Sequence, residues 1–335
     1  MTGAPNRESL IDKFGRTIDY VRISITDRCD FRCVYCMSED MQFLPRNEIL
    51  TLEELGVIGK TFVEMGVKKI RLTGGEPLVR QNCITLIQQL GALEDLEELA
   101  ITTNGSQLEK LASQIKNAGV KRINISLDSL LPEKFKLLTR TGNLHQVLRG
   151  IEAAKNAGFE RIKINSVILK NRNEKEVVPL TKFAIANGLD ITFIEEMPLG
   201  IIDGHDRAEV YYSSDKIKED LESVFTLSAT NESTGGPAKY FKLPDSTTRI
   251  GFISPHSHNF CGDCNRVRVT VEGRLLLCLG QEHSVDLREV IRKWPGRTDA
   301  LKTAIKKSMS IKPEGHTFDL NEQPIIFRHM SHTGG

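Results

Sequence analysis

The stretch TDRCDFRCVYC, residues 26–36, carries three cysteines at C-x3-C-x2-C spacing. Cys29, Cys33 and Cys36 follow directly after the β-rich run YVRISI, residues 20–25. In a reducing compartment such a group is metal-binding or catalytic rather than disulfide-bonded, because thiols stay reduced there. The stretch therefore predicts a metal centre at the end of the first strand, and the rest of the chain has to explain why the ligand set stops at three.

The composition is that of a soluble globular protein. Of the 335 residues, 39% are hydrophobic and 27% charged, and no apolar run approaches the roughly 20 residues of a membrane span. The amino-terminal stretch, residues 1–20, lacks the apolar core of a secretory signal. A net charge of +1 creates no global field that would attract nucleic acid or an acidic membrane. We therefore expect a cytoplasmic protein with no nucleic-acid partner and no membrane partner.

Six short β-rich runs alternate with amphipathic stretches along the first part of the chain. They are VRISIT at 21, KKIRLTGG at 68, ELAITTNG at 98, KRINISLD at 121, RIKINSVI at 161 and DITFIEEM at 190. The segment 51–66, TLEELGVIGKTFVEMG, spaces its apolar residues as a helix does, and Gly66 stands where a helix ends. Six β-α units in series predict an α/β fold whose parallel sheet curls into an incomplete TIM-like (βα)6 barrel.

The pattern changes after about residue 225. The runs AKYFKLP (238–244), TRIGFIS (248–254) and NRVRVTVEGRLLLCLG (265–280) predict strands, and the Glu-Gly pair at 272–273 predicts a hairpin turn. Helical segments are expected near residues 285 and 298. We place a domain boundary so that residues 1–230 form the barrel and residues 231–335 form an α+β subdomain.

Polar and glycine-rich motifs follow the predicted strands. After the cysteine run come TGGEP (73–77), TTNG (102–105), SLD (126–128) and EEMP (195–198). In barrels of this kind the catalytic groups lie at the carboxyl ends of the strands. The positions of these motifs indicate that the cysteines belong to an active site.

The cysteines alone leave more than one metal possible. Structural zinc usually takes four ligands, and the first group has no histidine within its segment, whereas three thiolates suit a [4Fe-4S] cluster with one open iron. A second group, Cys261, Cys264 and Cys278, has the spacing C-x2-C-x13-C. For this group zinc and iron–sulfur are equally compatible, because His256 or His258 would complete a Cys3His site.

The C-x3-C-x2-C motif with Tyr35 before its last cysteine resembles the radical S-adenosylmethionine (SAM) enzymes, and TGGEP matches their second motif. This resemblance implies that the first group holds a [4Fe-4S] cluster whose open iron binds SAM. The second cysteine group, NRVR after Cys264 and the Gly-Gly carboxyl terminus are similar to the GTP 3′,8-cyclases of molybdenum cofactor biosynthesis. That resemblance runs from IDKFGR (11–16) to the last residue and implies a second [4Fe-4S] cluster whose open iron contacts the guanine of GTP.

The resemblance also implies roles for single residues. The expected SAM contacts are Tyr35, Gly75, Ser126 and Met197. The expected GTP contacts are Arg22, Arg71, Thr102, Lys163, Arg266 and Arg268. The residues expected to act in catalysis are Arg22, Arg266, Arg268, Gly334 and Gly335. Ser38 after YCM and the threonine before the final glycines depart from the family pattern, and these departures concern local loop geometry and tail packing rather than the chemistry.

Strand alternation supports an anionic substrate independently of the resemblance. Lys69 and Arg71 alternate with aliphatic residues, so one face of the strand carries two cations. Two cations directed into a barrel lumen need anions, and a triphosphate supplies several. The arrangement returns in Lys163 with Asn165 and in Arg266 with Arg268. We therefore add Lys69 and Asn165 to the expected GTP contacts.

The resemblance implies a lyase that cleaves SAM reductively, abstracts the ribose 3′ hydrogen of GTP and joins C3′ to C8 of guanine. The product would be (8S)-3′,8-cyclo-7,8-dihydroguanosine 5′-triphosphate, formed in the first step of molybdopterin synthesis. Expected partners are GTP, a low-potential electron donor and the pterin-forming synthase that acts next, with the protein a monomer or a homodimer. Two alternatives stay open: a radical SAM enzyme that modifies a peptide, and an iron–sulfur scaffold or redox carrier. A peptide modifier has less use for inward cations, and a carrier leaves TGGEP unexplained.

Overall fold

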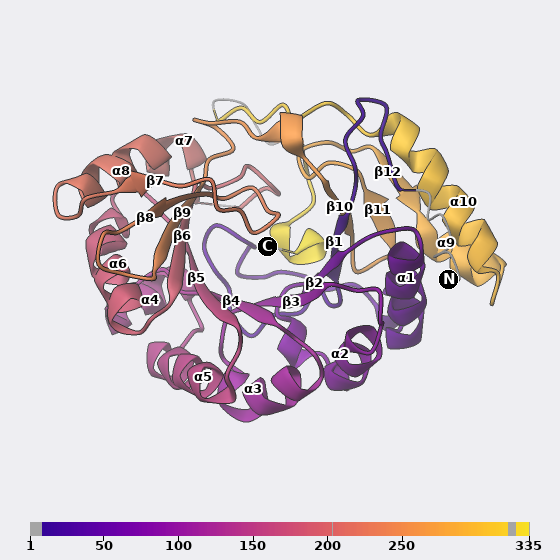
Figure 1. Cartoon of the computed structure of the whole chain (residues 1–335), viewed down its shortest axis with the longest axis horizontal. Coiled ribbons are helices and arrows are strands. Elements are labelled where there is room, and N and C mark those ends of the chain that lie inside the picture. The colour runs from indigo at the N-terminus through magenta and orange to yellow at the C-terminus, as the bar shows by residue number, and fades with distance from the viewer. Residues whose placement is uncertain (1–8, 203, 321–325, 335) are drawn as a thin grey trace, which may run out of the picture.

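The computed structural model describes residues 9–202, 204–320 and 326–334. The described strands form one curved twelve-stranded sheet in the order β12-β11-β10-β1-β2-β3-β4-β5-β6-β9-β8-β7 (Figure 1). Its centre consists of six consecutive parallel strands, which confirms the predicted β-α series. These strands are β1 (Tyr20–Ser24), β2 (Lys69–Thr73), β3 (Glu98–Thr103), β4 (Arg122–Ser126), β5 (Arg161–Val167) and β6 (Asp190–Ile194).

Helices cover the outer face of the curved sheet (Figure 1). They are α1 (Leu52–Glu64), α2 (Cys83–Gly91), α3 (Leu108–Asn117), α4 (Pro132–Thr139), α5 (Leu144–Ala157) and α6 (Val177–Ala186). The predicted helix at 51–66 is α1. It begins at a capping box, in which Thr51 and Glu54 each accept a hydrogen bond from the other's backbone N–H. It is followed by Gly66 at φ +94°, a left-handed conformation that glycine adopts without a steric penalty.

The strands after residue 225 extend both edges of the same sheet. β10 (Arg266–Val269) pairs in parallel with β1, and β9 (Arg249–Ile253) pairs in parallel with β6. The remaining strands are β7 (Ser228–Ala229), β8 (Lys239–Lys242), β11 (Arg274–Leu276) and β12 (Ser284–Asp286). β10 and β11 form the predicted hairpin, with Gly273 at φ +88° in its turn. The domain boundary at residues 230/231 stays a prediction, and strands on both sides of it share hydrogen bonds in one sheet.

Further helices complete the described part of the chain. They are α7 (Arg207–Val210), α8 (Ser214–Glu222), α9 (Leu287–Lys293), α10 (Thr298–Ser308) and α11 (Met330–Thr333). Short 3-10 turns are η1 (Arg46–Glu48), η2 (Pro77–Val79), η3 (Glu174–Glu176), η4 (Cys261–Asp263) and η5 (Met309–Ile311). α9 and α10 match the helical segments expected near 285 and 298. None of the described helices is long and apolar enough to span a bilayer.

The pleat of each central strand separates an apolar core from a polar lumen. In β2, Ile70 and Leu72 are fully buried in the core that the outer helices cover. Lys69 and Arg71 alternate with them and line the lumen on the other face, as strand geometry requires. The carboxyl-terminal helix α11 lies within the ring of strands (Figure 1). The fold therefore leaves a polar interior into which its own tail reaches.

Candidate functional site

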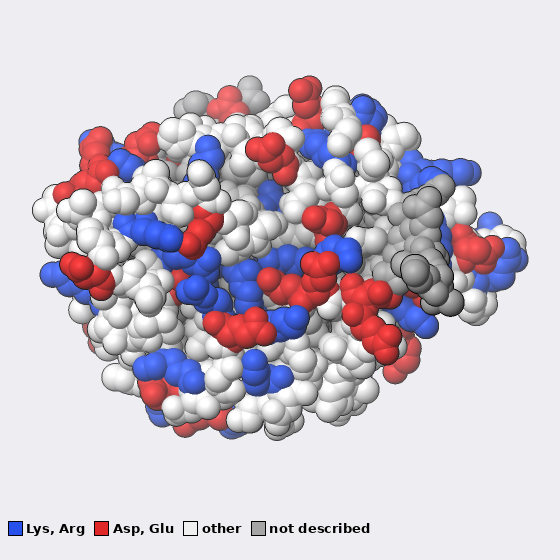
Figure 2. All heavy atoms as spheres, in the orientation of Figure 1, with Lys and Arg blue, Asp and Glu red and all other residues white. Residues whose placement is uncertain are grey.

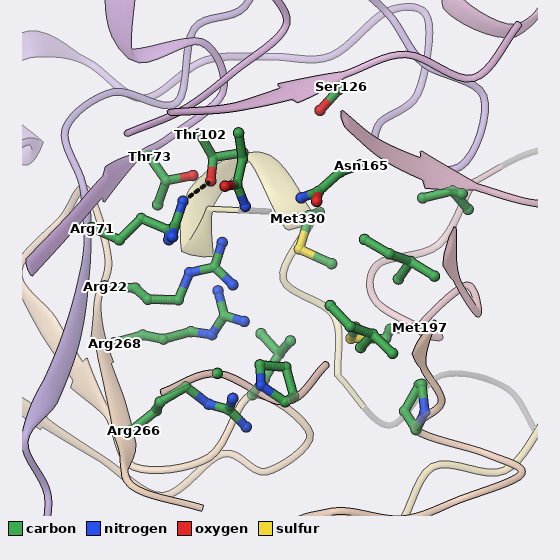
Figure 3. A pocket seen from close by; sticks show the side chains of 18 of the residues that line it. Arg22, Arg71, Thr73, Thr102, Ser126, Asn165, Met197, Arg266, Arg268 and Met330 are labelled. Atoms are coloured by element: carbon green, nitrogen blue, oxygen red, sulfur yellow. Dashed lines mark hydrogen bonds between the residues drawn. The ribbon is translucent and has the colours of Figure 1, made fainter. Parts of the chain in front are cut away.

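One pocket in the lumen, about 270 Å³ in volume, collects the residues that the sequence analysis singled out (Figure 3). Its lining includes all six cysteines of the two groups, the four residues expected at SAM and the eight expected at GTP. These residues come from β1, β2, β3, β4, β5 and β10 and from the loops that follow the strands. Segments that are far apart in the sequence therefore meet at one site.

The first cysteine group lies in the loop after β1. Backbone N–H groups of Arg32 and Val34 donate to carbonyls at the end of α4, at 2.9 Å each, which holds the loop over the barrel. The N–H of Phe31 donates to Cys29 Sγ at 3.3 Å. Burial raises the pKa of the Cys36 thiol to about 12, so metal binding there would release protons. Three thiols that line one pocket fit an iron–sulfur cluster with three protein ligands.

Polar residues within the quoted motifs support this loop, although the sequence analysis gave them no role. Tyr35 donates through its hydroxyl to Asp128 at 2.7 Å, and burial raises the pKa of Asp128 to about 6. Asn104 Nδ2 lies 3.7 Å from Cys29 Sγ and donates to Asp30 at 2.6 Å. Asp128 belongs to SLD and Asn104 to TTNG, so the positions of these motifs after their strands could have identified both residues.

The TGGEP motif joins the ends of neighbouring strands. The buried Glu76 carboxylate accepts from Thr103 Oγ1 at 2.8 Å and from the N–H of Asn104 at 2.6 Å. Burial raises the pKa of Glu76 to about 7. A Cβ on Gly75 would lie 2.3 Å from the Arg28 carbonyl oxygen, so the backbone can follow this path only with glycine.

The second cysteine group is held by a buried lysine. Lys312 is 1% exposed, and its Nζ donates to the carbonyls of Arg266 at 3.0 Å and Leu277 at 2.5 Å. The same Nζ lies 3.8 Å from Cys264 Sγ. Burial opposes ionisation of this thiol, but the charges of Arg266 and Lys312 lower the pKa of Cys264 below its usual value. No local motif marks Lys312, so sequence reasoning missed it.

The two histidines that kept a zinc site open have other partners. His256 Nε2 hydrogen-bonds to the Glu196 carbonyl at 2.8 Å, and His258 Nε2 to the Asp215 carboxylate at 2.8 Å. The histidine that lines the pocket is His316, whose Nδ1 lies 3.4 Å from the backbone nitrogen of Phe318. This arrangement favours a three-thiolate cluster over a zinc site completed by His256 or His258.

Four arginines extend from neighbouring strands into the pocket, toward Asn165 and Met197 on the other side (Figure 3). Strand register places Arg22 beside Arg71 on one side and Arg268 on the other. Burial and the neighbouring positive charges lower the pKa of Arg268 well below its usual range. Lys and Arg atoms also gather in the hollow at the centre of the face seen in Figure 2. Like charges at this density favour an anionic ligand.

The tail reaches this cationic wall. Arg268 Nη1 donates to the Gly334 carbonyl, although Gly334 does not itself line the pocket. A Cβ on Gly334, at φ +78°, would lie 2.1 Å from Thr73 Cγ2, so both its conformation and its surroundings require glycine. Gly335 lies outside the described residues.

Asn124 and Asn165 add unsatisfied polar atoms to the same pocket. The Oδ1 atom of each is buried and has no hydrogen-bond partner within the described part of the chain. Buried amide oxygens normally have partners, so these two indicate a ligand that donates hydrogen bonds.

Comparison with solved structures confirms the fold class. Streptococcus suis SuiB, in a crystal structure bound to S-adenosylmethionine, aligns with a TM-score of 0.64 over 96% of this chain and 79% of that chain. The sequence identity is 13%, so the likeness extends to the fold alone.

Sequence comparison identifies the family. Residues 23–184 match the radical SAM superfamily, and residues 189–318 match the family described as Molybdenum Cofactor Synthesis C. The GTP 3′,8-cyclase of Saccharophagus degradans is 56% identical over 98% of this chain and 99% of its own length. The GTP 3′,8-cyclase of Pseudomonas putida strain W619 is 58% identical over the same shares. With two cysteine groups and a cationic wall in one lumen, the chain belongs to the GTP 3′,8-cyclase family of radical SAM enzymes.

Proposed function

We propose that this protein is a radical SAM GTP 3′,8-cyclase, which converts GTP to (8S)-3′,8-cyclo-7,8-dihydroguanosine 5′-triphosphate in the first step of molybdenum cofactor synthesis. One observation carries the proposal: two separate three-cysteine groups and six cationic side chains line the same pocket. The cations are Arg22, Lys69, Arg71, Lys163, Arg266 and Arg268. A nucleoside triphosphate is an anion that suits such a wall.

The first cysteine group would hold a [4Fe-4S] cluster that, together with bound SAM, supplies a 5′-deoxyadenosyl radical. Tyr35, Gly75, Ser126 and Met197 would bind and orient SAM beside it. The hydrogen bond from Tyr35 to Asp128 supports this role, because it fixes the segment between Cys33 and Cys36. At Gly75 the missing side chain lets the TGGEP backbone pack against the Arg28 carbonyl, which places this motif beside the loop that carries Cys29.

The cations would hold the triphosphate of GTP, and the second cysteine group would hold a second [4Fe-4S] cluster that contacts guanine. Asn165 and Asn124 would accept hydrogen bonds from the sugar or the base, which would satisfy their buried Oδ1 atoms. The Thr102 hydroxyl accepts a hydrogen bond from Arg71 Nη1 at 3.3 Å. This contact orients the Arg71 guanidinium before a ligand binds. These contacts would align the ribose 3′ carbon with the radical.

The reaction balances with two electrons and one proton. On one-electron reduction, bound SAM would supply the 5′-deoxyadenosyl radical with methionine as the other product, and the 3′ hydrogen of GTP would end in 5′-deoxyadenosine. C3′ would then bond to C8 of guanine, with a second electron and a proton at N7 completing the dihydro product. The chain's contribution is to hold the reacting carbon atoms together and to exclude water and other hydrogen donors. Arg22, Arg266, Arg268 and the terminal glycines would act in this positioning.

The relatives favour this reaction over peptide modification, because they are GTP 3′,8-cyclases at 56–58% identity over nearly the full chain. The low-potential electron donor, the pterin-forming synthase as the next enzyme, a monomeric or homodimeric state and a cytoplasmic location stay predictions.

The proposal is tested by anaerobic incubation of reconstituted protein with SAM, dithionite and GTP deuterated at C3′. We expect one deuterium in the 5′-deoxyadenosine that is released, together with the cyclic dihydro product. A Cys261→Ala variant serves as the control for product formation that depends on the second cysteine group. Release of unlabelled 5′-deoxyadenosine, with GTP recovered unchanged, would contradict the proposal.

A further inference from the structure

Two buried tyrosines hold cations at the pocket. Tyr20, on β1, is 4% exposed, and its hydroxyl accepts from Arg71 Nε at 2.7 Å. The Lys69 ammonium lies 5.0 Å from the centre of the same ring, within cation–π range. Tyr20 therefore contacts two cations of the proposed triphosphate site through two different interactions.

Tyr240, on β8, also contacts two cations. Its side chain is 2% exposed, and its hydroxyl lies 3.2 Å from Lys163 Nζ. The Lys163 ammonium is 5.7 Å and the Arg249 guanidinium 5.2 Å from the centre of the Tyr240 ring. Both tyrosines lie in runs that were predicted as strands, residues 20–25 and 238–244, but neither was assigned a role in the site.

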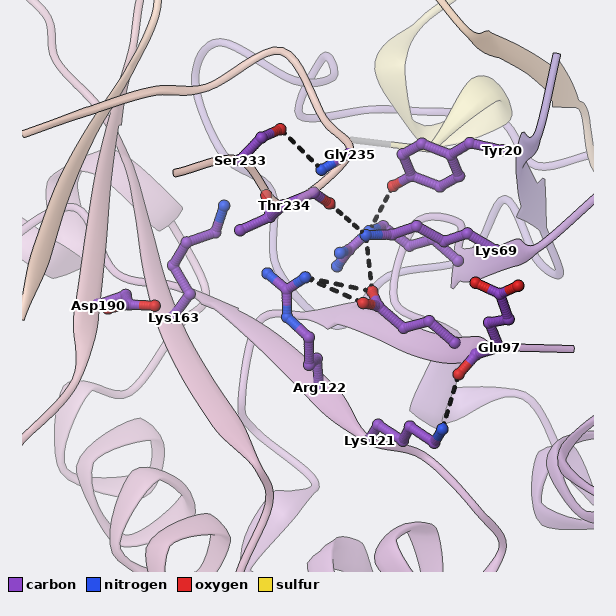
Figure 4. A network of polar contacts seen from close by, with 12 residues as sticks. Tyr20, Lys69, Glu97, Lys121, Arg122, Lys163, Asp190, Ser233, Thr234 and Gly235 are labelled. Atoms are coloured by element: carbon purple, nitrogen blue, oxygen red, sulfur yellow. Dashed lines mark hydrogen bonds and ion pairs between the residues drawn. The ribbon is translucent and has the colours of Figure 1, made fainter. Parts of the chain in front are cut away.

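Thr234 contacts both sets, and Figure 4 shows its contact with Lys69. Its carbonyl accepts from Lys69 Nζ at 2.7 Å, and its hydroxyl lies 3.2 Å from the Tyr240 hydroxyl. Thr234 lies in the loop between β7 and β8, so this loop crosses from Tyr240 to the first residue of β2. A continuous chain of contacts thus runs from Arg71 through Tyr20, Lys69, Thr234 and Tyr240 to Lys163.

Neutral hydroxyls suit this task better than carboxylates. At Arg71 and Lys163 a carboxylate partner would neutralise the cation and repel phosphate, whereas a neutral phenol accepts a hydrogen bond and leaves the positive charge available. Glu98 is the carboxylate paired with Lys69, at 2.7 Å, and it also pairs with Arg122 at 3.0 Å. Cations that are held in place before the ligand arrives lose less side-chain freedom on binding.

We propose that Tyr20 and Tyr240 are positioning residues that fix Arg71, Lys69 and Lys163 at the spacing a nucleoside triphosphate requires. Thr234 joins the two halves of this frame. The inference rests on the proposed function, and it adds that recognition of the phosphate chain, rather than of the base, depends on the two phenols. The affinity for guanosine, which carries no phosphate, should not depend on the two phenols.

The charge state of Tyr20 provides a second readout. The groups that face it are Arg22 on its own strand, Lys69 and Arg71 on β2, and Arg266 and Arg268 on β10. Burial raises the pKa of Tyr20, but the positive charges of Arg71, Arg22 and Lys69 outweigh burial and lower it to about 7. A bound triphosphate favours the neutral phenol, so GTP affinity should fall as the pH rises through 7 and the phenolate forms.

The experiment measures binding of GTP, guanosine and SAM to anaerobically reconstituted protein by equilibrium dialysis. The variants are Tyr20→Phe and Tyr240→Phe, which keep the ring and remove the hydroxyl. The matched control is Tyr212→Phe, which removes a hydrogen bond to Asp220 outside the pocket lining. We expect the GTP dissociation constant to rise about tenfold in Tyr20→Phe and in Tyr240→Phe, because each hydroxyl contacts a cation that lines the pocket. Guanosine and SAM binding should stay unchanged, and the control should match the wild type for all three ligands.

Two further comparisons separate positioning from general damage. In the Arg71→Ala background, Tyr20→Phe should have little additional effect on GTP binding, because its hydrogen-bond partner is gone. Between about pH 6 and pH 8, GTP affinity should fall less in Tyr20→Phe than in the wild type. The phosphate groups of GTP titrate equally in both measurements, so the difference between the two proteins reports on Tyr20.

The outcomes distinguish this inference from the proposed function. If the wild type binds no GTP, the proposed function fails. If the wild type binds GTP and both phenylalanine variants bind it equally well, the phenol frame is wrong. Equal weakening of GTP and guanosine would also overturn it, because the effect would then not depend on phosphate.

Discussion

Replacement of Lys312 by methionine tests the role of the buried lysine at the second cysteine group. Methionine has nearly the same length and volume, so the change leaves no large cavity and removes only the ammonium. The ammonium donates to the carbonyls of Arg266 and Leu277, which lie next to the segments that carry Cys264 and Cys278. The lysine therefore ties the segment that carries Cys261 and Cys264 to the segment that carries Cys278.

The expected cost follows from those two carbonyls. The Leu277 carbonyl loses its donor while it stays buried, whereas the contact with the Arg266 carbonyl is part-buried. A buried unpaired polar group costs about 1–3 kcal/mol, so the free energy of unfolding should fall by at least about 1–3 kcal/mol. The positive charge near Cys264 is also lost, which should raise the pKa of that thiol and weaken its binding to iron.

The assay combines iron and sulfide analysis of anaerobically purified protein with its unfolding midpoint in urea. Lys312→Met should keep about four iron per chain and cleave SAM, but lose the second cluster and the cyclic product. Lys302→Met is the control, because Lys302 pairs with Glu64 at the surface and such pairs contribute about 1 kcal/mol or less. A Lys312→Met protein that holds both clusters and unfolds at the same midpoint as Lys302→Met would refute the reasoning.

Other predictions concern the two cysteine groups, the cations and the tail. Cys29→Ala should abolish SAM cleavage, whereas Cys261→Ala should keep part of the SAM cleavage and lose the GTP product. Chromatography of released 5′-deoxyadenosine measures the cleavage. If both variants lose SAM cleavage and product equally while each keeps its remaining cluster, the two cysteine groups do not have separate roles. Arg71→Ala should weaken GTP binding by about 1.5–3 kcal/mol, the range for a hydrogen bond to a charged group, and SAM binding much less. Equilibrium dialysis measures both, and an unchanged GTP affinity would point to a different substrate pocket. Deletion of residues 334–335 should leave iron content and GTP affinity nearly intact but lower product formation, because Arg268 loses its contact with the tail. A truncated protein with wild-type turnover would show that the tail is dispensable.

Much of the barrel and part of the site were predictable because their signals are local. Strand and helix periodicity is set by the backbone geometry of a few neighbouring residues, so the six β-α units could be read from hydrophobic spacing. The direction of Lys69 and Arg71 followed from strand alternation in the same way. The cysteine spacings and TGGEP are short motifs with a specific chemical meaning. Because they follow predicted strands, they placed the active site at the carboxyl ends of the barrel strands.

The meeting of distant segments had no local signal. Parallel pairing of β10 with β1 places Arg266 and Arg268 beside Arg22, across more than two hundred intervening residues. Lys312, Tyr240 and Thr234 lie in segments whose local patterns resemble ordinary loops and edge strands. Their roles depend on which groups the folded chain places next to them. That choice is made by the packing free energy of the whole chain, since burial of a cation or a phenol is favourable only where a partner from another segment satisfies it.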